Sequence, residues 1–260
     1  MISHQIAPMM VRAVDPAESG NDTAGYGIAQ DGQTYVIKSP LKHPLLPATE
    51  AFCEILAHAC QLPATVGAWI EVDGVSCYGS KFEGGLEKAL PVVNSRLTLD
   101  SRKRQWKRCT NPGIASATFA LDLFVFNYDR HHNNWAFQDQ NGNLTARIFD
   151  FSRAWWTCAK DVANLPPPED MKLLPKTSER TCRDYAAVRV WAGEDLKAAQ
   201  KVLDLLKQIT TQWVEKRILE LPTGWVDKTT LDTTLAWWDS PQKNARVDAI
   251  NEGMKNATLV

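Results

Sequence analysis

Three polar side chains near the middle of the chain have the types and spacing that phosphoryl transfer requires. Asp129 is followed five residues later by Asn134, and Asp150 follows a predicted strand pair. In phosphoryl-transfer sites one Asp receives or orients the acceptor hydroxyl, while an Asn and a second Asp hold metal ions on the nucleotide phosphates. These residue types suit the task because Mg²⁺ prefers hard oxygen ligands. The pattern therefore supports the hypothesis of a phosphoryl-transfer site.

The same residues also have a simpler interpretation. Asn and Asp are common in loops because their side chains hydrogen-bond the nearby backbone in turns. The spacing alone is therefore a weak signal, and its context decides. An apolar run, Ala115–Phe126, predicts a helix that ends just before Asp129. A hairpin turning at Asn141-Gly142 is predicted to end at Asp150. This context favours chemistry over an ordinary turn.

A candidate cation lies at the end of a predicted N-terminal strand. Strands are expected over residues 8–14 and 26–29, and Asp31-Gly32 predicts a hairpin turn into a third strand, Thr34–Lys38. A buried strand would not normally end in Lys unless that Lys is paired. A surface Lys at a strand end is an equally good interpretation of this segment alone.

A helix predicted to open at Pro47 and to end at Leu62 offers two partners for Lys38. Glu50 and Glu54 lie in its early turns, where negative charge suits the helix dipole. Residues four apart share a helix face, so periodicity does not choose between them. The Glu that does not pair with Lys38 is expected to be a solvated surface charge.

A glycine-rich segment follows the next predicted strands. Residues 65–72 and 75–82 are expected to form a hairpin with a turn at Asp73-Gly74. Residues 78–85 then leave the sheet with three glycines, which suggests a hinge between lobes. Backbone groups in this segment would be open to a planar ligand, although a plain flexible loop has the same composition.

Composition describes an ordinary globular protein without a strong electrostatic field. The 260 residues are 44% hydrophobic and 23% charged, with a formal net charge of -1. That length allows one sizeable core, or one domain in two lobes. The basic stretch 86–113 with Trp106 is expected to be a solvated helix face or a surface for an acidic partner. A nucleic-acid partner is not expected.

The cysteines and the apolar runs indicate a reducing compartment. The six Cys show no CxxC pair and no metal-ligand spacing, and Cys53 and Cys60 are expected to be small buried hydrophobes. We find no signal peptide and no apolar run near the ~20 residues that span a bilayer. A cytoplasmic protein without a membrane span is therefore expected. Most of the ten Trp are expected in the core or lining a groove.

The chain after Asp150 is expected to be a long irregular loop followed by helices. Residues 165–170 are too rich in proline for a helix interior. Helices are then predicted over residues 183–191, 195–221, 231–238 and 240–254. The second of these has apolar residues at helical spacing and is expected to be a core helix.

Taken together, the chain resembles the HipA-like kinases, particularly a short single-domain branch, and more distantly the type II phosphatidylinositol 4-kinases. The resemblance covers nearly the whole chain. The matching segments are Tyr35-Val36-Ile37-Lys38, Thr49-Glu50 through Leu62-Pro63, Tyr78-Gly79-Ser80, Asn127-Tyr128-Asp129-Arg130 with Asn134-Trp135, Phe149-Asp150-Phe151-Ser152-Arg153-Ala154 and Leu221-Pro222-Thr223-Gly224-Trp225.

The resemblance implies an α+β, two-lobed protein-kinase-like fold in a single domain. Residues 1–83 would form the N-lobe, with an antiparallel sheet and one helix, and 86–260 a mostly helical C-lobe. The hinge would lie near residues 78–85.

The resemblance also implies a role for each candidate residue. Lys38 would hold the ATP phosphates and pair with Glu50, and Asp129 would be the catalytic Asp. Asn134 and Asp150 would bind Mg²⁺. The adenine would be carried by the segment Tyr78, Gly79, Ser80, Lys81 and Phe82.

The implied activity is transfer of the ATP γ-phosphoryl group to a protein Ser or Thr hydroxyl. A lipid kinase and a catalytically inactive kinase fold that acts as a binding module are the alternatives. A protein substrate and a regulatory partner protein are the implied partners. Asp150 is followed by Phe-Ser where common protein kinases have Phe-Gly. The separate N-terminal domain of full-length HipA proteins has no counterpart here, so their antitoxin and DNA contacts do not carry over.

The loop of residues 19–23 supports one further hypothesis. Gly20 and Gly25 permit positive φ, so backbone N–H groups could face an anion. In HipA-like kinases the corresponding loop can be phosphorylated by the enzyme itself, and Ser19 is the better candidate here, ahead of Thr23. A simple hairpin turn is the alternative.

Overall fold

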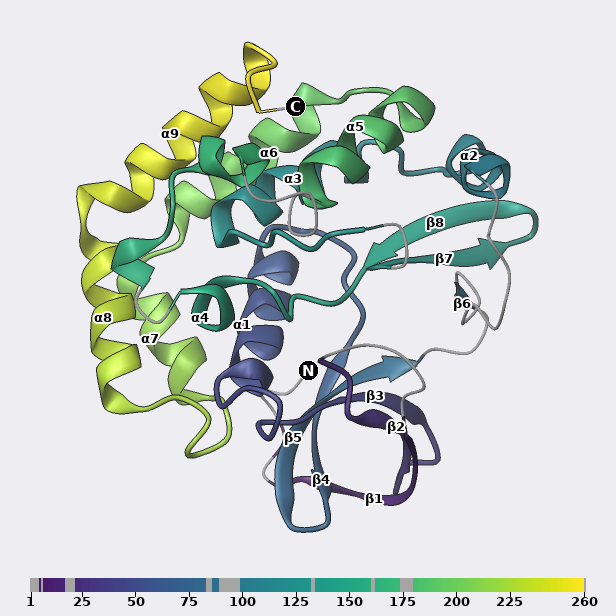
Figure 1. The fold of residues 1–260 in the computed structure, drawn as a ribbon, viewed down its shortest axis with the longest axis vertical. Coiled ribbons are helices and arrows are strands. Elements are labelled where there is room, and N and C mark those ends of the chain that lie inside the picture. Colours follow the sequence, from purple (N-terminus) through teal and green to yellow (C-terminus); the bar gives the residue numbers. More distant parts are fainter. Residues whose placement is uncertain are drawn as a thin grey trace.

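The computed structural model combines a small β-barrel with a larger, mostly helical part (Figure 1). It describes residues 5, 7–16, 22–82, 86–88, 99–131, 134–159, 162–173 and 180–259. The barrel strands are β1 (Met9–Pro16), β2 (Gly25–Ala29), β3 (Thr34–Lys38), β4 (Gly67–Val72) and β5 (Val75–Phe82). We call the rest of the described chain, including helix α1 (Leu46–Ala59), the helical body. The α+β prediction is confirmed.

Local turn chemistry shapes the barrel. Its strands follow the order β1-β2-β3-β5-β4, and a parallel pair between β1 and β4 closes it. Asp73 and Gly74 both adopt positive φ and Gly32 does the same, as tight hairpin turns require. Inside lies a small apolar cluster: Ala29, Tyr35, Ile37, Ala68, Ile70 and Cys77.

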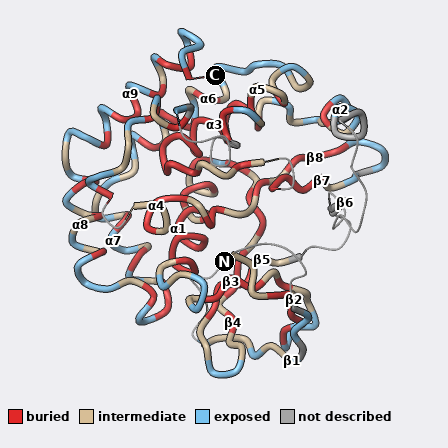
Figure 2. Tube along the Cα trace, viewed as in Figure 1, coloured by how far each residue is buried: buried red, intermediate tan, exposed pale blue. Residues whose placement is uncertain are grey.

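Helix α1 lies between β3 and β4 in the sequence but packs into the helical body. Phe52 stacks on Trp155 and Trp156, with ring centroids 5.4 and 5.3 Å away. These rings belong to the main hydrophobic cluster, which continues from α1 through the C-terminal helices. Figure 2 shows that α1 and α3 (Ile114–Val125) consist almost entirely of buried residues. The core of the molecule therefore lies along these two helices.

A second, three-stranded sheet is built from one strand before α3 and two strands after it. Its strands are β6 (Leu86–Lys88), β7 (Trp135–Gln140) and β8 (Asn143–Ile148). Asn141 and Gly142 turn the β7–β8 hairpin with φ of 56° and 88°, as predicted from the sequence. The basic helix α2 (Leu99–Lys107) exposes Lys103, Arg104 and Lys107, but its Trp106 is buried against Trp135 and Phe137.

The remaining helices complete the helical body. They are α4 (Trp155–Cys158), the short 3₁₀ helices η3 (Val162–Asn164) and η4 (Pro168–Leu173), α5 (Arg180–Ala192), α6 (Leu196–Gln208), α7 (Thr211–Leu219), α8 (Lys228–Asp239) and α9 (Pro241–Lys255). Most Trp side chains are buried, as expected. No helix in the described part of the chain is long and apolar enough to cross a membrane.

One sequence prediction about the helices needs correction, and two others fall at least partly outside the described residues. The single helix expected over residues 195–221 is two helices, α6 and α7, because Thr210 leaves helical geometry and its hydroxyl caps α7 by accepting from the N–H of Trp213. Residues 17–21, with the proposed phosphorylation site Ser19, lie outside the described residues, as do residues 83–85 of the expected hinge.

Candidate active site

Lys38 lies between two carboxylates that come from distant parts of the chain. Its Nζ is 3.1 Å from Glu50 Oε1 and 2.9 Å from Asp150 Oδ1, and only 3% of its side chain is exposed. β3 ends at Lys38, and its pairing with β5 fixes where that end lies. The buried ammonium therefore joins the barrel to the helical body.

The structure pairs Lys38 with Glu50 and not with Glu54, as the resemblance implied. Glu50 Oε2 also accepts a hydrogen bond from the N–H of Phe151, at 2.8 Å. The expectation that the other Glu is a solvated charge is wrong. Glu54 is buried, where it accepts from the Tyr78 hydroxyl at 2.8 Å and lies 3.4 Å from His58 Nε2. One helical turn after Glu50, the Glu54 carboxylate therefore has a structural partner, the buried hydroxyl of Tyr78.

Asp150 follows β8 and has a left-handed backbone, with φ of 65°. Its Oδ1 accepts from Lys38 and from the N–H of Ser152 at 3.3 Å. An Asp at positive φ is uncommon, and strained backbone is concentrated at functional sites. About a quarter of the Asp150 side chain (24%) is exposed, so the group faces both Lys38 and solvent.

The three charges shift one another's pKa. Burial raises the pKa of Glu50 to about 7, although Lys38 opposes that shift. Burial would lower the pKa of Lys38, but the carboxylates of Asp150 and Glu50 together hold it above its ordinary value. Burial likewise acts to raise the pKa of Asp150, yet the charge and hydrogen bond of Lys38 bring it below the usual range. Asp150 therefore stays ionised at neutral pH, ready for a cation.

Asp129 lies in a turn that is supported by a buried ion pair. Arg130 donates from Nε to Asp122 Oδ2 at 2.9 Å and from Nη2 to Asp122 Oδ1 at 3.0 Å. Asp122 also accepts from Asn127 Nδ2, and Arg130 Nη1 donates to the carbonyl oxygen of Phe149. The residue on each side of the Tyr128-Asp129 turn is therefore tied to α3. Sequence reasoning did not identify Asp122, although one charge inside an apolar helix was a usable signal.

Asn134 and Asp129 are linked directly. Asn134 Nδ2 donates to the backbone carbonyl of Asp129 at 3.1 Å, and the Asn134 side chain is buried. This orientation commits the amide nitrogen to the protein and leaves the amide oxygen as the donor atom for a cation.

Asp150 and Asn134 can supply two of the oxygen ligands of a Mg²⁺ ion, and nucleotide phosphates and water would have to supply the rest. The described residues contain no cluster of three or more His, Cys, Asp or Glu that could hold a metal. Mg²⁺ is commonly held by one or two protein oxygens together with substrate phosphates and water. One carboxylate and one amide oxygen match that incomplete set.

The predicted adenine segment does not offer an open backbone. Tyr78, Gly79 and Ser80 lie in β5, which pairs with β3 on one side and β4 on the other. Their backbone groups therefore serve the sheet, so the expectation of an open backbone at these three residues is wrong, while their role in carrying the adenine stays a prediction. Gly79 is needed for packing, since a Cβ there would lie 3.0 Å from Ile70 and Tyr35. Contacts to a nucleotide from Lys81 and Phe82 stay a prediction.

Arg153 adds a contact that the sequence did not predict. Its Nε lies 2.9 Å from Asp22 Oδ2, and it hydrogen-bonds Tyr128 beside Asp129. Partial burial acts to lower the pKa of Arg153, but the charge of Asp22 and the contact with Tyr128 together hold it above its ordinary value. Segments before β2, after α3 and after β8 thus meet at one guanidinium.

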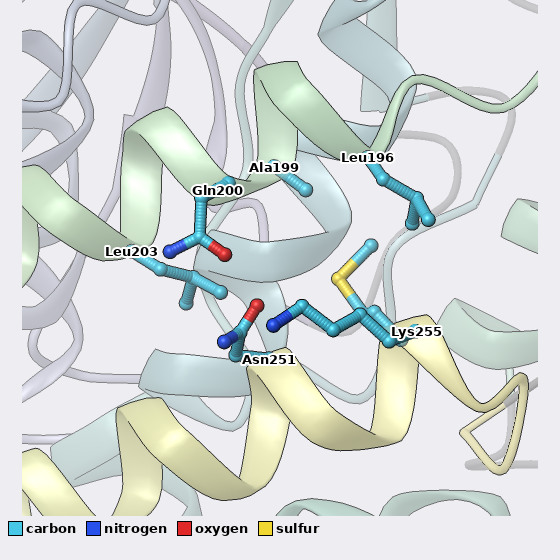
Figure 3. A pocket seen from close by; sticks show the side chains of 7 residues that line it. Leu196, Ala199, Gln200, Leu203, Asn251 and Lys255 are labelled. Carbon is cyan, nitrogen blue, oxygen red and sulfur yellow. The ribbon is translucent and has the colours of Figure 1, made fainter.

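A separate hollow between α6 and α9 carries none of this chemistry. Figure 3 shows Leu196, Ala199, Gln200 and Leu203 of α6 facing Asn251 and Lys255 of α9. None of the candidate site residues lines it. Its lining has no carboxylate, and the amine of its Lys255 pairs with Glu252 at 3.6 Å, so we assign it no reaction.

Comparison with known proteins identifies the fold. No model of a known protein family matches the chain, and no curated protein matches it in sequence. Among solved structures, the Helicobacter pylori proinflammatory kinase CtkA is similar, with a TM-score of 0.59 and 12% identity over 95% of this chain and 98% of that one. This similarity shows a kinase-like fold.

Two further structures are similar at lower scores. HipA of Shewanella oneidensis MR-1, solved with HipB and operator DNA, gives a TM-score of 0.49 and 11% identity over 87% of this chain and 62% of that one. An aminoglycoside phosphotransferase of Alicyclobacillus acidocaldarius gives 0.28 and 14% over 95% of this chain and 93% of that one. Neither score adds to the conclusion drawn from CtkA.

Proposed function

We propose that this chain is an ATP-dependent phosphotransferase that moves the γ-phosphoryl group of ATP to a hydroxyl. The observation that carries the proposal is the buried Lys38, held between Glu50 at 3.1 Å and Asp150 at 2.9 Å. Burying a Lys and its two carboxylates costs desolvation free energy. An apolar group at this position would avoid that cost, so the buried charges point to a functional role. Lys–Glu pairing next to a metal-binding Asp is the arrangement that kinases need for activity.

Each remaining residue has a role in this proposal. Lys38 binds the ATP phosphates, and Glu50 holds Lys38 in place. Asp129 orients the acceptor hydroxyl and receives its proton as the new P–O bond forms, while the bond between the γ-phosphorus and the bridging oxygen breaks and ADP leaves. Asp150 and Asn134 hold Mg²⁺, which when bound neutralises charge on the phosphates. Because Asp150 and Asn134 are the two metal ligands proposed among the described residues, metal and nucleotide should bind together.

We propose a protein Ser or Thr hydroxyl as the acceptor. This choice depends on the resemblance to HipA-like kinases, and a lipid hydroxyl is the alternative. An inactive binding module is disfavoured because Lys38, Asp129, Asn134 and Asp150 are all present. A module that only bound nucleotide would have no need of Asp129.

The test is incubation with γ-labelled ATP, Mg²⁺ and a cell lysate, followed by identification of the labelled species. Label in protein that withstands lipid extraction supports the proposal, and label in the lipid fraction supports the alternative. Asp129→Ala should abolish labelling while nearly preserving Mg·ATP binding. Asp139→Ala is the matched control, because Asp139 is an exposed-hairpin carboxylate paired with Arg108. Full activity in Asp129→Ala would overturn the assignment.

A further inference from the structure

Thr181 reaches from α5 to the turn that presents Asp129. Its Oγ1 accepts a hydrogen bond from the backbone N–H of Arg130 at 2.8 Å. The same hydroxyl donates to the backbone carbonyl of Asn127 at 2.5 Å. Only 1% of Thr181 is exposed, so water does not compete for either bond.

The two backbone groups that Thr181 joins are those at the ends of a four-residue turn. In a closed β-turn the carbonyl of the first residue accepts from the N–H of the fourth. Here these residues are Asn127 and Arg130, and the Thr181 hydroxyl stands between their groups. Asp129 is the third residue of that turn. The width of the turn, and with it the direction of the Asp129 backbone, therefore depends on one hydroxyl.

Few side chains can replace this hydroxyl. The position needs one atom that both donates and accepts, and among short side chains only Ser and Thr provide such an oxygen. A Val of the same shape would leave a buried carbonyl and a buried N–H without that partner. The turn could recover the bonds only by closing on itself, which would move Asp129.

The position of the hydroxyl is itself fixed by α3. Tyr185 of α5 stacks on Phe119 of α3 with ring centroids 4.0 Å apart, and its hydroxyl lies 3.0 Å from Ser116 Oγ. Because Asp122 of the same helix holds Arg130, α3 determines both supports of the turn. Thr181 of α5 and Asp122 of α3 thus both hold the turn, and the two helices pack directly against each other.

We propose that Thr181 is a positioning residue for phosphoryl transfer: its hydroxyl sets the turn that aims Asp129 at the acceptor. This inference rests on the proposed function. It predicts that loss of the hydroxyl lowers kcat far more than it weakens nucleotide binding. Lys38 and Asp150 do not depend on the hydroxyl for their partners, and Asn134 is linked to the turn only through the Asp129 carbonyl.

The experiment compares Thr181→Val with Thr181→Ser. We expect kcat of the Val variant to fall by roughly 100-fold, the effect of a misplacement of about 1 Å. The Kd for Mg·ATP should stay within about twofold of wild type, because the hydroxyl contacts no phosphate-binding group. Thr181→Ser should recover most of the lost kcat. Equal losses in both variants, or a folded Val variant with wild-type kcat, would overturn the proposal.

Thr234→Val is the matched control. Thr234 is also fully buried, and its hydroxyl donates to the carbonyl of Thr230 while accepting from Trp156 Nε1 at 3.1 Å. Its loss should lower the Tm by an amount similar to that in Thr181→Val, roughly 2–8 °C. The kcat of Thr234→Val should stay near wild type. The comparison therefore separates the effect of the position of Asp129 on kcat from the effect of lost stability.

Hydrogen exchange separates failure of this inference from failure of the proposed function. The Arg130 amide should be protected in wild type and in Thr181→Ser, and exposed to exchange in Thr181→Val. If wild type transferred no phosphoryl group, the proposed function would fail and the catalytic part of this inference with it. Equal protection of Arg130 in all three proteins, together with an unchanged kcat in Thr181→Val, would overturn the inference even in an active enzyme.

Discussion

The barrel and the helical body contribute to the candidate site in opposite ways. The barrel encloses a small cluster of short and medium side chains around Ile37 and Ile70. The helical body buries a continuous core that includes stacked and edge-on aromatic rings around Trp155. The barrel supplies the cation Lys38, and the helical body supplies the carboxylates that meet it.

This difference shows which part can hold a strained group. Asp150 keeps a positive φ because its neighbours, Phe151 and Trp155, are buried in the large core. Glu50 is fixed for the same reason, since its helix packs through Phe52 into that core. Lys38 has only the end of a strand behind it. We infer that the carboxylates form the rigid half of the site and that Lys38 adapts to them.

Replacing Lys38 should have the largest effect, because it removes the cation that the described barrel strands bring to the carboxylates of Glu50 and Asp150. Lys38→Met keeps the length of the side chain and should lower phosphoryl transfer by about 1000-fold or more. It leaves Glu50 buried without its cation, which costs about 3–5 kcal/mol of folding free energy. Steady-state kinetics and urea unfolding measure the two effects.

A second substitution separates them. Lys38→Met combined with Glu50→Gln removes the uncompensated charge, so most of the lost stability should return while activity does not. If the double variant were as unstable as Lys38→Met, the loss would not come from the uncompensated charge of Glu50 but from the lost partner of Asp150.

A cavity in the core of the helical body should disturb the candidate site, whereas a cavity in the barrel core should mainly loosen the barrel strands. Phe52→Ala should cost about 3–5 kcal/mol. It should also weaken Mg·ATP binding, because Glu50 lies on the same helix. Ile70→Ala in the barrel should cost about 2–5 kcal/mol and should raise hydrogen exchange in the barrel strands first. Urea unfolding and amide exchange test both. Equal exchange throughout both variants would mean that the barrel and the helical body unfold as one unit.

The fold was largely predictable because its signals are local. The turns at Asp73-Gly74 and Asn141-Gly142 and the apolar run of α3 depend on residues close together in the chain. The break at Thr210 was missed because apolar spacing continues across it, and only the cap geometry marks the boundary.

The candidate residues were predictable by type, but their contacts were not. Spacing could not choose between Glu50 and Glu54, since both face one way and both are buried. The packing of α1 against the barrel sets Glu50 on Lys38 and Glu54 on Tyr78. The Thr181 hydroxyl lies more than 50 positions from the turn it holds, and no short motif encodes a contact of that range.

A smaller effect is expected where the C-terminal half of the helical body contacts the barrel. Trp225 Nε1 donates to Ser76 Oγ of β5 at 2.7 Å, and Trp69 Nε1 donates to the same oxygen at 2.8 Å. Trp225→Phe should cost about 1 kcal/mol, the usual net value of such a bond. In a double-mutant cycle with Ser76→Ala, additive losses would show that the bond does not join the two parts.

The smallest expected effect is a dependence of stability on pH. It tests whether Lys38 of the barrel or burial in the helical body determines the charge state of Glu50. Burial raises the pKa of Glu50 from its ordinary 4.5 to about 7. The folded protein therefore binds a proton that the unfolded chain does not, at pH values between these two limits. The contribution of this group to stability is complete below pH 4.5 and is lost as the pH rises through 7.

Glu50→Gln isolates this titration, because Gln stays neutral at every pH. We expect the Tm of wild type to rise relative to that of Glu50→Gln as the pH falls from about 8 to about 5. Other groups that titrate in this range, His43 among them, are present in both proteins and cancel in the difference. A constant difference in Tm would mean that Glu50 stays ionised throughout, and that the charge of Lys38 outweighs burial by the large core. In that case the barrel, and not the helical body, would set the charge state of the site.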